Sequence, residues 1–327
     1  MKKMRILITG NSGFIGRFLS EKLIDKGYAV LGLDIKQDKH AQGYLQCFKG
    51  DILSKRDVEK TADEVNLIIH LAAKHHDFGV SKEEFYKVNV EGTKNILDCA
   101  SRKNIKKLIF VSSVAVYNDE NMPVDESTEL KPKNLYGKSK LEAEKLVKEW
   151  ASRDPERSVI VVRPAVVFGP YNYANMYNLI DNIYKGRFFL VGKGNNIKSV
   201  AYVENLVDAI IFFIGKMQPG LNIFNYSDEP HMTTKEIVEI ISKHLNKRVS
   251  NFRLPLRFVL TAASVIDLCA KLTGKNFPIQ SFRIKKFAED TFYKSNAIKE
   301  TGFKPMVSLD EGFKNMVDWY LKKEVRG

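Results

Sequence analysis

Tyr136 and Lys140 stand four residues apart in the segment LYGKSKLEAE. If this segment is a helix, both side chains lie on one face. A phenol with a reference pKa of about 10 is a poor base at neutral pH, but a neighbouring ammonium group favours its phenolate form. Such a pair can take a proton from an alcohol. Ser113, in VSSVAVY, stands at the end of a predicted strand and is placed to hold the substrate oxygen. Ser113, Tyr136 and Lys140 are therefore the predicted catalytic group for hydride transfer at an alcohol carbon.

A second candidate site follows the first predicted strand, where TGNSGFIG has a glycine at every third position. Gly10 allows a tight turn, Gly13 lets the backbone approach a pyrophosphate, and Gly16 lets the next helix pack close to the strand. The N-terminus of that helix presents free N–H groups to an anion. Asp34 ends the second predicted strand, where a carboxylate binds a ribose 2′-hydroxyl and repels a 2′-phosphate. The pattern predicts a site for NAD rather than NADP.

Further residues near the ends of predicted strands are expected to surround the same cofactor. An acid after the third strand is placed to hold the adenine amine, and small residues after the fourth leave room for the dinucleotide. An asparagine in the next helix is placed to brace the strand ends. The expected cofactor-binding set includes Tyr136 and Lys140 and is completed by Phe14, Ile15, Asp51, Ile52, Leu71, Ala72, Ala73, Asn89, Pro164 and Val167.

The elements that position these residues alternate between strand and helix. Short apolar runs predict strands at residues 5–9, 29–34, 47–51, 67–71, 107–112 and 158–164. Helical patterns between them predict helices at residues 13–27, 85–101 and 136–152. This alternation predicts an α/β fold with a doubly wound parallel sheet of the Rossmann type. The ligands of such sheets bind at the carboxyl ends of the strands.

The pattern changes after Gly169-Pro170, where short strands mix with helices and Gly/Asn loops. We expect the first part, residues 1–169 plus 199–219, to form the NAD-binding Rossmann domain. Residues 170–198 plus 220–327 are expected to form a smaller, mostly helical substrate-binding lobe. A helix at residues 203–215 is predicted to return to the main sheet, and helices at residues 233–245, 256–273 and 309–321 are predicted in the second lobe.

Composition narrows the class of protein. The formal net charge of the 327 residues is +13, but the lysines are spread along the chain and no nucleic-acid recognition motif accompanies them. An anionic substrate, such as a nucleotide diphosphate, is compatible with this charge. The three scattered cysteines have no metal-binding or disulfide spacing, which indicates a reducing, cytoplasmic setting without a metal site. No apolar run is long enough to span a membrane. Residues 254–272 are interpreted as an amphipathic core helix, with peripheral membrane contact as the weaker alternative.

The order of the motifs carries a family resemblance. TGNSGFIG, HLAA, VNVEGT, VSSVAVY, VDES, LYGKSKLEAE, VRPAVVFGP and AYVENLVDAI together cover about residues 4 to 215. In these motifs the chain resembles the extended short-chain dehydrogenase/reductases, in the NAD-dependent epimerase/dehydratase branch. The resemblance implies that Ser113, Tyr136 and Lys140 are catalytic, that Lys140 also holds the nicotinamide ribose, and that the protein is a homodimer. Many members of this branch act on nucleotide sugars.

The resemblance also bears on the reaction. The 4,6-dehydratases of this branch carry Asp-Glu directly after the catalytic hydroxyl residue, where this chain has Val114-Ala115, so dehydration is not expected. Galactose-type epimerases usually have Asn at the position of Val166 and Arg-Asp at Lys198-Ser199. The stretch KSVAYVENLVDAI is more similar to reductases and epimerases of surface-polysaccharide sugars. The resemblance thus favours an epimerase or oxidoreductase that acts at C4 of a UDP-hexose or UDP-N-acetylhexosamine.

The substrate contacts are predicted on the same basis. His75 is expected near the nicotinamide, Asn175 at the sugar or diphosphate, and Lys198 and Arg283 at the diphosphate. Three alternatives stay open. The first is a 4-keto-sugar reductase that does not epimerise. The second is a 3β-hydroxysteroid dehydrogenase-like enzyme on a lipidic alcohol, which LPLRFVLTAASVIDLCAKLTG resembles. The third is an NAD-binding redox sensor, although such proteins typically lack the catalytic tyrosine.

Overall fold

The computed structural model places a parallel sheet at the centre of the chain. It describes residues 3–36, 43–44, 46–75, 80–117, 122–249, 253–257, 259–261, 264 and 288–326. Within these residues, seven parallel strands form the main sheet in the order β11-β6-β5-β4-β1-β2-β3. Their bounds are β1 (Arg5–Thr9), β2 (Ala29–Asp34), β3 (Gln46–Lys49), β4 (Leu67–His70), β5 (Lys107–Val111), β6 (Ser158–Pro164) and β11 (Gly220–Tyr226). The order reverses between β1 and β4, which is the switch point where doubly wound sheets bind their ligands.

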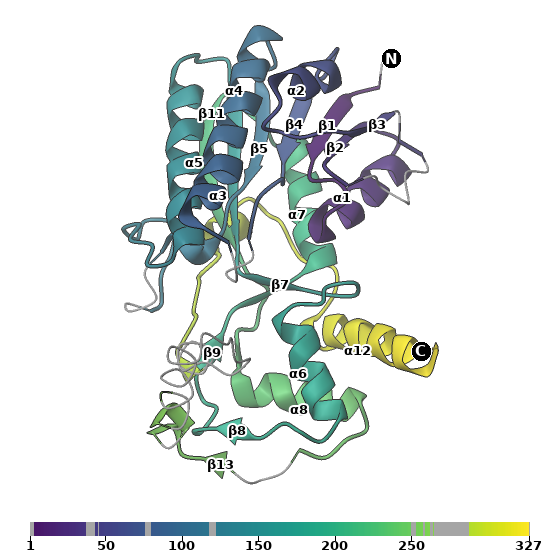
Figure 1. Cartoon of the computed structure of the whole chain (residues 1–327), viewed down its shortest axis with the longest axis vertical. Coiled ribbons are helices and arrows are strands. Elements are labelled where there is room, and N and C mark those ends of the chain that lie inside the picture. Colours follow the sequence, from purple (N-terminus) through teal and green to yellow (C-terminus); the bar gives the residue numbers. More distant parts are fainter. Residues whose placement is uncertain are drawn as a thin grey trace.

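Helices cover both faces of this sheet (Figure 1). Alternate strand residues point to opposite faces. Ile6 and Ile8 of β1 therefore join one apolar cluster with helices α1 and α7, while Leu7 joins a second cluster with α2, α4 and α5. This burial on both faces explains why the strands are apolar almost throughout. The bounds of these helices are α1 (Phe14–Asp25), α2 (Lys55–Thr61), α4 (Gly92–Arg102), α5 (Leu135–Ser152) and α7 (Val203–Ile214).

A smaller lobe lies at the carboxyl ends of the strands (Figure 1). Its longer helices are α6 (Asn175–Tyr184), α8 (Thr234–His244) and α12 (Leu309–Arg326). The short strands β9 (Ile197–Lys198) and β12 (Met232–Thr233) pair there, as do β8 (Leu190–Val191) and β13 (Arg253–Leu254). The strands β7 (Val166–Phe168) and β10 (Val200–Tyr202) form a third small sheet at the junction with the main sheet. Most of the predicted helix 256–273 lies outside the described residues.

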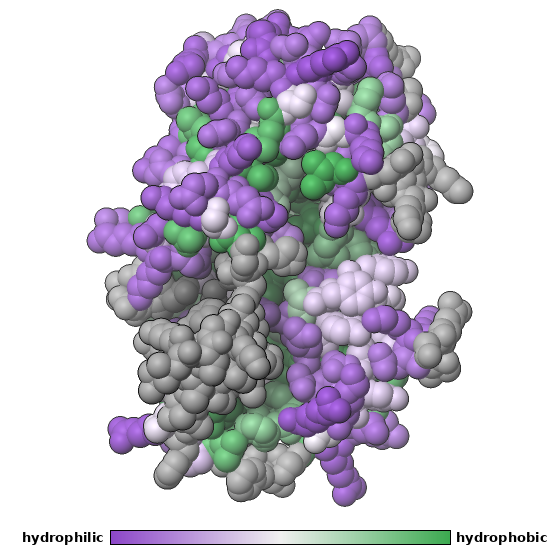
Figure 2. Space-filling view, viewed as in Figure 1, coloured by the Kyte–Doolittle hydropathy of each residue, from purple (hydrophilic) through white to green (hydrophobic). Residues whose placement is uncertain are grey.

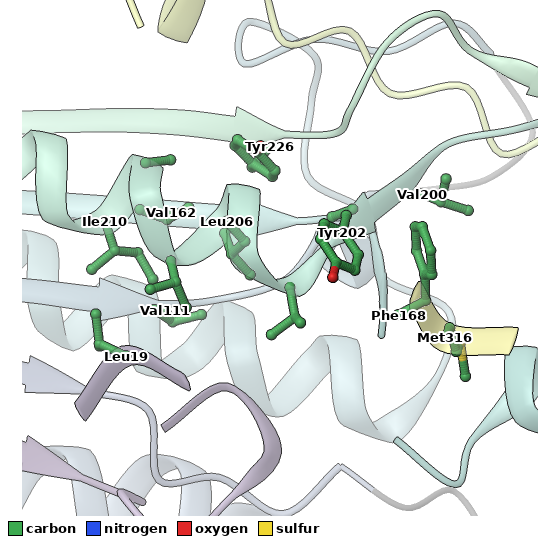
Figure 3. Close-up of a cluster of buried hydrophobic side chains, with 14 of the residues drawn as sticks. Leu19, Val111, Val162, Phe168, Val200, Tyr202, Leu206, Ile210, Tyr226 and Met316 are labelled. Carbon is green, nitrogen blue, oxygen red and sulfur yellow. The ribbon is translucent and has the colours of Figure 1, made fainter. Parts of the chain in front are cut away.

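One continuous apolar core joins the two parts of the molecule. In Figure 3, side chains of the sheet and of α7 lead through Phe168 and Tyr202 to Met316 on α12. The rings of Phe168 and Phe313 stack with centroids 4.3 Å apart. Gly312 lets α12 pack close to Tyr202, because a Cβ atom there would lie 2.9 Å from the Tyr202 ring. On the face shown in Figure 2 most residues are hydrophilic, and apolar residues lie mainly in recesses between them. The lobe is thus packed onto the sheet.

The structure corrects the expected domain boundary. We expected residues 220–226 to belong to the second lobe, but β11 pairs along its whole length with β6, from Gly220 opposite Ser158 to Tyr226 opposite Pro164. The short helix α11 (Asn296–Glu300) packs against β11 as well. The sequence analysis predicts no strand at residues 220–226, because this part of the chain is expected to be mostly helical, and pairing with a distant strand leaves no mark in the local pattern. These two segments belong with the main sheet.

Candidate active site

The structure brings Ser113, Tyr136 and Lys140 to one edge of the sheet. Ser113 follows β5 and caps a short 3-10 turn, η2 (Val114–Val116), by accepting a hydrogen bond from the N–H of Ala115 at 3.2 Å. Tyr136 lies in the first turn of α5, which Asn134 caps through the N–H of Gly137. The two elements touch closely, because a Cβ atom at Gly137 would lie 2.1 Å from the carbonyl oxygen of Ala115.

Lys140 is buried one helical turn after Tyr136. Its Nζ atom donates to the carbonyl oxygen of Val111, at the end of β5, at 2.7 Å. The ring of Phe110 lies beneath it, with its centroid 4.3 Å from Nζ. Burial lowers the pKa of Lys140 from 10.5 to about 7, and the carboxylate of Glu144 acts in the opposite direction. The ammonium group is thus close to its deprotonation point at neutral pH, where a small change of surroundings alters its charge.

This lowered pKa predicts a pH dependence of stability. Between pH 7 and 10 the folded chain has released the Lys140 proton, whereas the unfolded chain still holds it, so the free energy of unfolding rises with pH. Below about pH 7 folding must keep an ammonium group in the interior, and this contribution is at its least favourable. We expect Lys140→Met to lack the rise. Urea unfolding of both proteins at pH 7 and pH 9 measures it, and an identical pH response of the two would contradict a lowered pKa.

Asn89 braces this site from the neighbouring helix. It lies in the π-helical turn η1 (Lys87–Glu91), between α3 (Lys82–Tyr86) and α4, and π-turns often occur at functional sites. Its amide nitrogen donates to the carbonyl oxygen of Lys74 and to Ser139 Oγ, while its oxygen accepts from the N–H of Lys74. Asn89 therefore ties the loop after β4 to α5. Both amide hydrogens are used within the protein, so the contacts that the structure shows for Asn89 are bracing contacts, and its predicted contact with the cofactor stays a prediction.

His70 forms a second buried brace, which the sequence did not reveal. Its ring nitrogens lie 2.6 Å from Thr9 Oγ1 and 3.0 Å from Thr93 Oγ1. Thr93 donates its own hydroxyl hydrogen to the carbonyl oxygen of Asn89, so its oxygen can only accept from His70 Nε2. Burial and, secondly, the charge of Lys140 lower the pKa of His70 to about 3. A neutral histidine thus links the ends of β1 and β4 to α4.

The glycine loop has the geometry that a dinucleotide needs. Gly10 has a φ of +75°, and a Cβ atom there would lie 2.8 Å from the backbone nitrogen of Ala72. At Gly16 a Cβ atom would lie 2.2 Å from the carbonyl oxygen of Gly10. Helix α1 begins after Gly13 with no side-chain cap and no acid in its first turn. Its first N–H groups are therefore open to an anion such as a pyrophosphate.

Asp34 stands at the end of β2, beside this loop. Its carboxylate accepts hydrogen bonds from the N–H of Ser12 at 3.1 Å and the N–H of Lys36 at 2.9 Å. These bonds hold the carboxylate next to the glycine turn and leave lone pairs for ribose hydroxyls. The residues present therefore fit NAD.

The other predicted cofactor residues occupy the expected strand ends. Leu71, Ala72 and Ala73 follow β4 and are half-buried. Asp51 follows β3, where its carboxylate accepts from the N–H of Leu53. Ile52 is buried against α4, since a Cβ atom at Gly92 would lie 2.5 Å from its Cδ1. The remaining members of the set are half-buried or buried on α1, β6 and β7: Phe14, Ile15, Pro164 and Val167.

The predicted substrate residues lie on separate elements. His75 is exposed on the loop after β4. Asn175 is the exposed first residue of α6. Lys198, on β9, donates to the carbonyl oxygen of Glu289 at 2.6 Å. Arg283 lies outside the described residues, so its prediction stays open.

Two charged residues behind the site were not predicted as functional. Arg163 and Glu144 are 1% and 0% exposed and form a bidentate ion pair, with N···O distances of 2.9 and 2.6 Å. Two features of the sequence could have indicated these residues: an arginine inside the apolar strand SVIVVRP, and a glutamate four residues after Lys140.

The described part of the chain contains no cluster of His, Cys, Asp and Glu side chains suited to a metal ion. Of its helices, none combines the length and the apolar character needed to span a bilayer.

Comparison with known proteins gives a family, two relatives and a similar structure. The NAD dependent epimerase/dehydratase family matches residues 6–226. N-acetyl-alpha-D-glucosaminyl-diphospho-ditrans,octacis-undecaprenol 4-epimerase of Escherichia coli O157:H7 is 34% identical over 94% of this chain and 92% of its own length. UDP-glucose 4-epimerase of Vibrio cholerae is 28% identical over 98% and 97%. The crystal structure of UDP-glucose 4-epimerase from Thermotoga maritima, 22% identical, has the same fold, with a TM-score of 0.77 and coverage of 98% and 100%.

The family match covers the glycine loop, Asp34, and the Ser113, Tyr136 and Lys140 group, and ends with the last strand of the main sheet. The chain belongs to the NAD-dependent epimerase/dehydratase family of enzymes.

Proposed function

We propose that this enzyme epimerises C4 of an N-acetylhexosamine carried on a diphosphate. The observation that carries the proposal is the Ser113, Tyr136 and Lys140 group, which lies at the carboxyl edge of the sheet together with an NAD-compatible glycine loop. The name of the 34% identical relative supports the sugar and the position of the reaction.

The roles of the three residues follow from their chemistry. Tyr136, as phenolate, takes the proton of the C4 hydroxyl, and Ser113 holds the same oxygen by a hydrogen bond. While it holds its proton, Lys140 supplies the positive charge that stabilises the phenolate, and its amino group helps to hold the nicotinamide ribose. NAD bound in this site would supply a reversible acceptor for the C4 hydride. Inversion requires that the hydride return to the opposite face of the resulting C4 ketone, and Tyr136 then returns the proton to the oxygen, so the sugar would leave with the opposite configuration and no net oxidation.

Two features favour epimerisation over related reactions. Val114 and Ala115 have no acid or base, and Val114 is 6% exposed, so the group that elimination of water would need is missing from the turn after Ser113. A complete Tyr, Lys and Ser group also argues against a sensor that only binds NAD. We assign the second lobe, with Asn175 and Lys198, to the sugar diphosphate, because it faces the carboxyl ends of the strands (Figure 1).

The carrier of the sugar is the finer part of the proposal. The similarity to the relative that acts on a polyprenol-linked sugar extends over 94% of this chain, which supports undecaprenyl diphosphate as the carrier. A uridine diphosphate carrier would present the same diphosphate and the same sugar to the site. The net charge of +13 is compatible with both.

The test uses purified protein without added NADH. We expect GlcNAc-diphospho-undecaprenol in detergent to give a product with the GalNAc configuration, detected by chromatography of the sugar released with mild acid. UDP-GlcNAc is assayed in parallel, and faster conversion of UDP-GlcNAc would assign the nucleotide carrier instead. If neither is epimerised while a 4-keto sugar consumes added NADH in equal amount, the enzyme is a reductase. Turnover of a 3β-hydroxysteroid alone would assign a lipidic alcohol.

A further inference from the structure

Arg163 is a buried cation with no direct place in the proposed reaction. It is 1% exposed, near the end of the apolar strand β6. Its Nε and Nη2 atoms donate to the carboxylate of Glu144, and its Nη1 atom donates to Tyr117 Oη at 2.7 Å. Burial acts to lower the pKa of Arg163, but the bonds to Glu144 and Tyr117 outweigh it and leave the pKa raised. The guanidinium group is therefore charged and fully directed toward two partners.

These two partners belong to the two elements that hold the Ser, Tyr and Lys group. Glu144 lies on α5, one helical turn after Lys140. Tyr117 directly follows the turn η2, and Ser113 is the N-cap of that turn. One planar guanidinium group thus bonds to the helix with Tyr136 and Lys140 and to the turn with Ser113. Because the donors of the guanidinium group have a rigid planar arrangement, Arg163 constrains the distance between α5 and the turn η2.

Two further contacts restrict the movement of α5 and η2 relative to each other. Tyr117 passes its own hydroxyl hydrogen to Asn225 Oδ1 on β11 at 2.9 Å, so its ring cannot turn without loss of two buried hydrogen bonds. On the other side, Gly137 of α5 meets the carbonyl oxygen of Ala115 in η2. This contact prevents a closer approach of the two elements, while the Arg163 bonds prevent their separation.

Stability alone does not explain such a buried pair. The cost of removing two charges from water commonly cancels their attraction, and apolar residues of similar volume are often as stable. The geometry of catalysis does explain it, because one substrate oxygen must lie within hydrogen-bonding distance of both Ser113 and Tyr136, and a displacement of about 1 Å can cost about 100-fold in rate. We propose that Arg163 is a positioning residue that sets the spacing between Ser113 and Tyr136, an inference that rests on the catalytic roles proposed above.

The first test removes the hydrogen bond between Arg163 and Tyr117. Tyr117→Phe deletes only the hydroxyl group that joins Arg163 to the Ser113 turn. We expect kcat to fall by about 10- to 100-fold, with KM, the bound NAD content and the pH profile close to those of the wild type. Tyr320→Phe is the matched control, because it deletes a hydroxyl of another buried tyrosine, bonded to Asp181 on α6 at 2.8 Å. Equal kcat values for the two variants would overturn the proposal.

The second test removes both charges. In Arg163→Met/Glu144→Leu, apolar residues replace the ion pair, so the fold should persist, as a thermal melt would show. We expect kcat to fall as for Tyr117→Phe. Loss of the Glu144 carboxylate also removes support for the Lys140 ammonium group, so the alkaline limit of activity should move to lower pH. Wild-type kcat in this double variant would contradict the positioning role.

A structural measurement separates this inference from the proposed function. If the wild-type protein turns over none of the substrates named above, the proposed function fails, but a crystal structure of the double variant still reports the spacing. We expect the distance between Ser113 Oγ and Tyr136 Oη to change by about 1 Å, or to be split between conformers. An unchanged, single spacing would overturn the positioning role whatever the substrate.

Discussion

Replacing Tyr136 with phenylalanine is expected to lower kcat by about 10²- to 10⁴-fold, the range typical of a lost general acid–base group. The change removes one oxygen atom and keeps the aromatic ring, whose centroid lies 6.3 Å from that of Phe85. Helix α5 and its cap at Asn134 are untouched. The loss should therefore appear in turnover, while thermal stability and the amount of NAD that copurifies stay near the wild-type values.

The matched control is Tyr28→Phe, which makes the same chemical change at a partly buried tyrosine beyond the far end of α1. Turnover by Tyr28→Phe should equal that of the wild type. The informative assay follows both the epimerised sugar and the redox state of the bound cofactor during one turnover. If Tyr136→Phe reduced bound NAD at the wild-type rate, Tyr136 would not be the group that removes the hydroxyl proton.

The second large effect is expected for Gly16→Ala, which should disrupt the glycine loop. The added Cβ atom would lie 2.2 Å from the carbonyl oxygen of Gly10 and 2.7 Å from Asn11 Cα. Both are backbone atoms, so a rotamer change cannot relieve the clash, and α1 must move away from β1. Overpacking of this kind costs about 1–3 kcal/mol or more, and the movement displaces the helix N-terminus that would face the pyrophosphate.

We therefore expect Gly16→Ala to melt at a lower temperature and to copurify with little or no NAD. Gly215→Ala is the control, because Gly215 has a negative φ of −76° and a Cβ atom there would meet nothing closer than the carbonyl oxygen of Phe212, at 3.7 Å. That variant should match the wild type in both measurements. Full NAD occupancy in Gly16→Ala would contradict the assigned role of this loop.

The sequence by itself determined the features that depend on local pattern. The alternation of strands and helices predicts the doubly wound sheet, because period 2 and period 3.6 are properties of short segments. The spacing of Gly10, Gly13 and Gly16 and the four-residue step from Tyr136 to Lys140 are equally local. Chemical type alone was enough to propose an anion-binding loop and a phenol paired with an ammonium group.

Only the tertiary structure decided what depends on distant partners. The edge position of β11 arises from its pairing with β6, about 60 residues earlier in the chain. The bonds of Arg163 join residues 19 and 46 positions away, and no periodicity points to them. The lowered pKa of Lys140 likewise arises from burial against β5. Desolvation, like the spacing of two catalytic elements, is a property of the packed interior, so it exists only once the chain has folded.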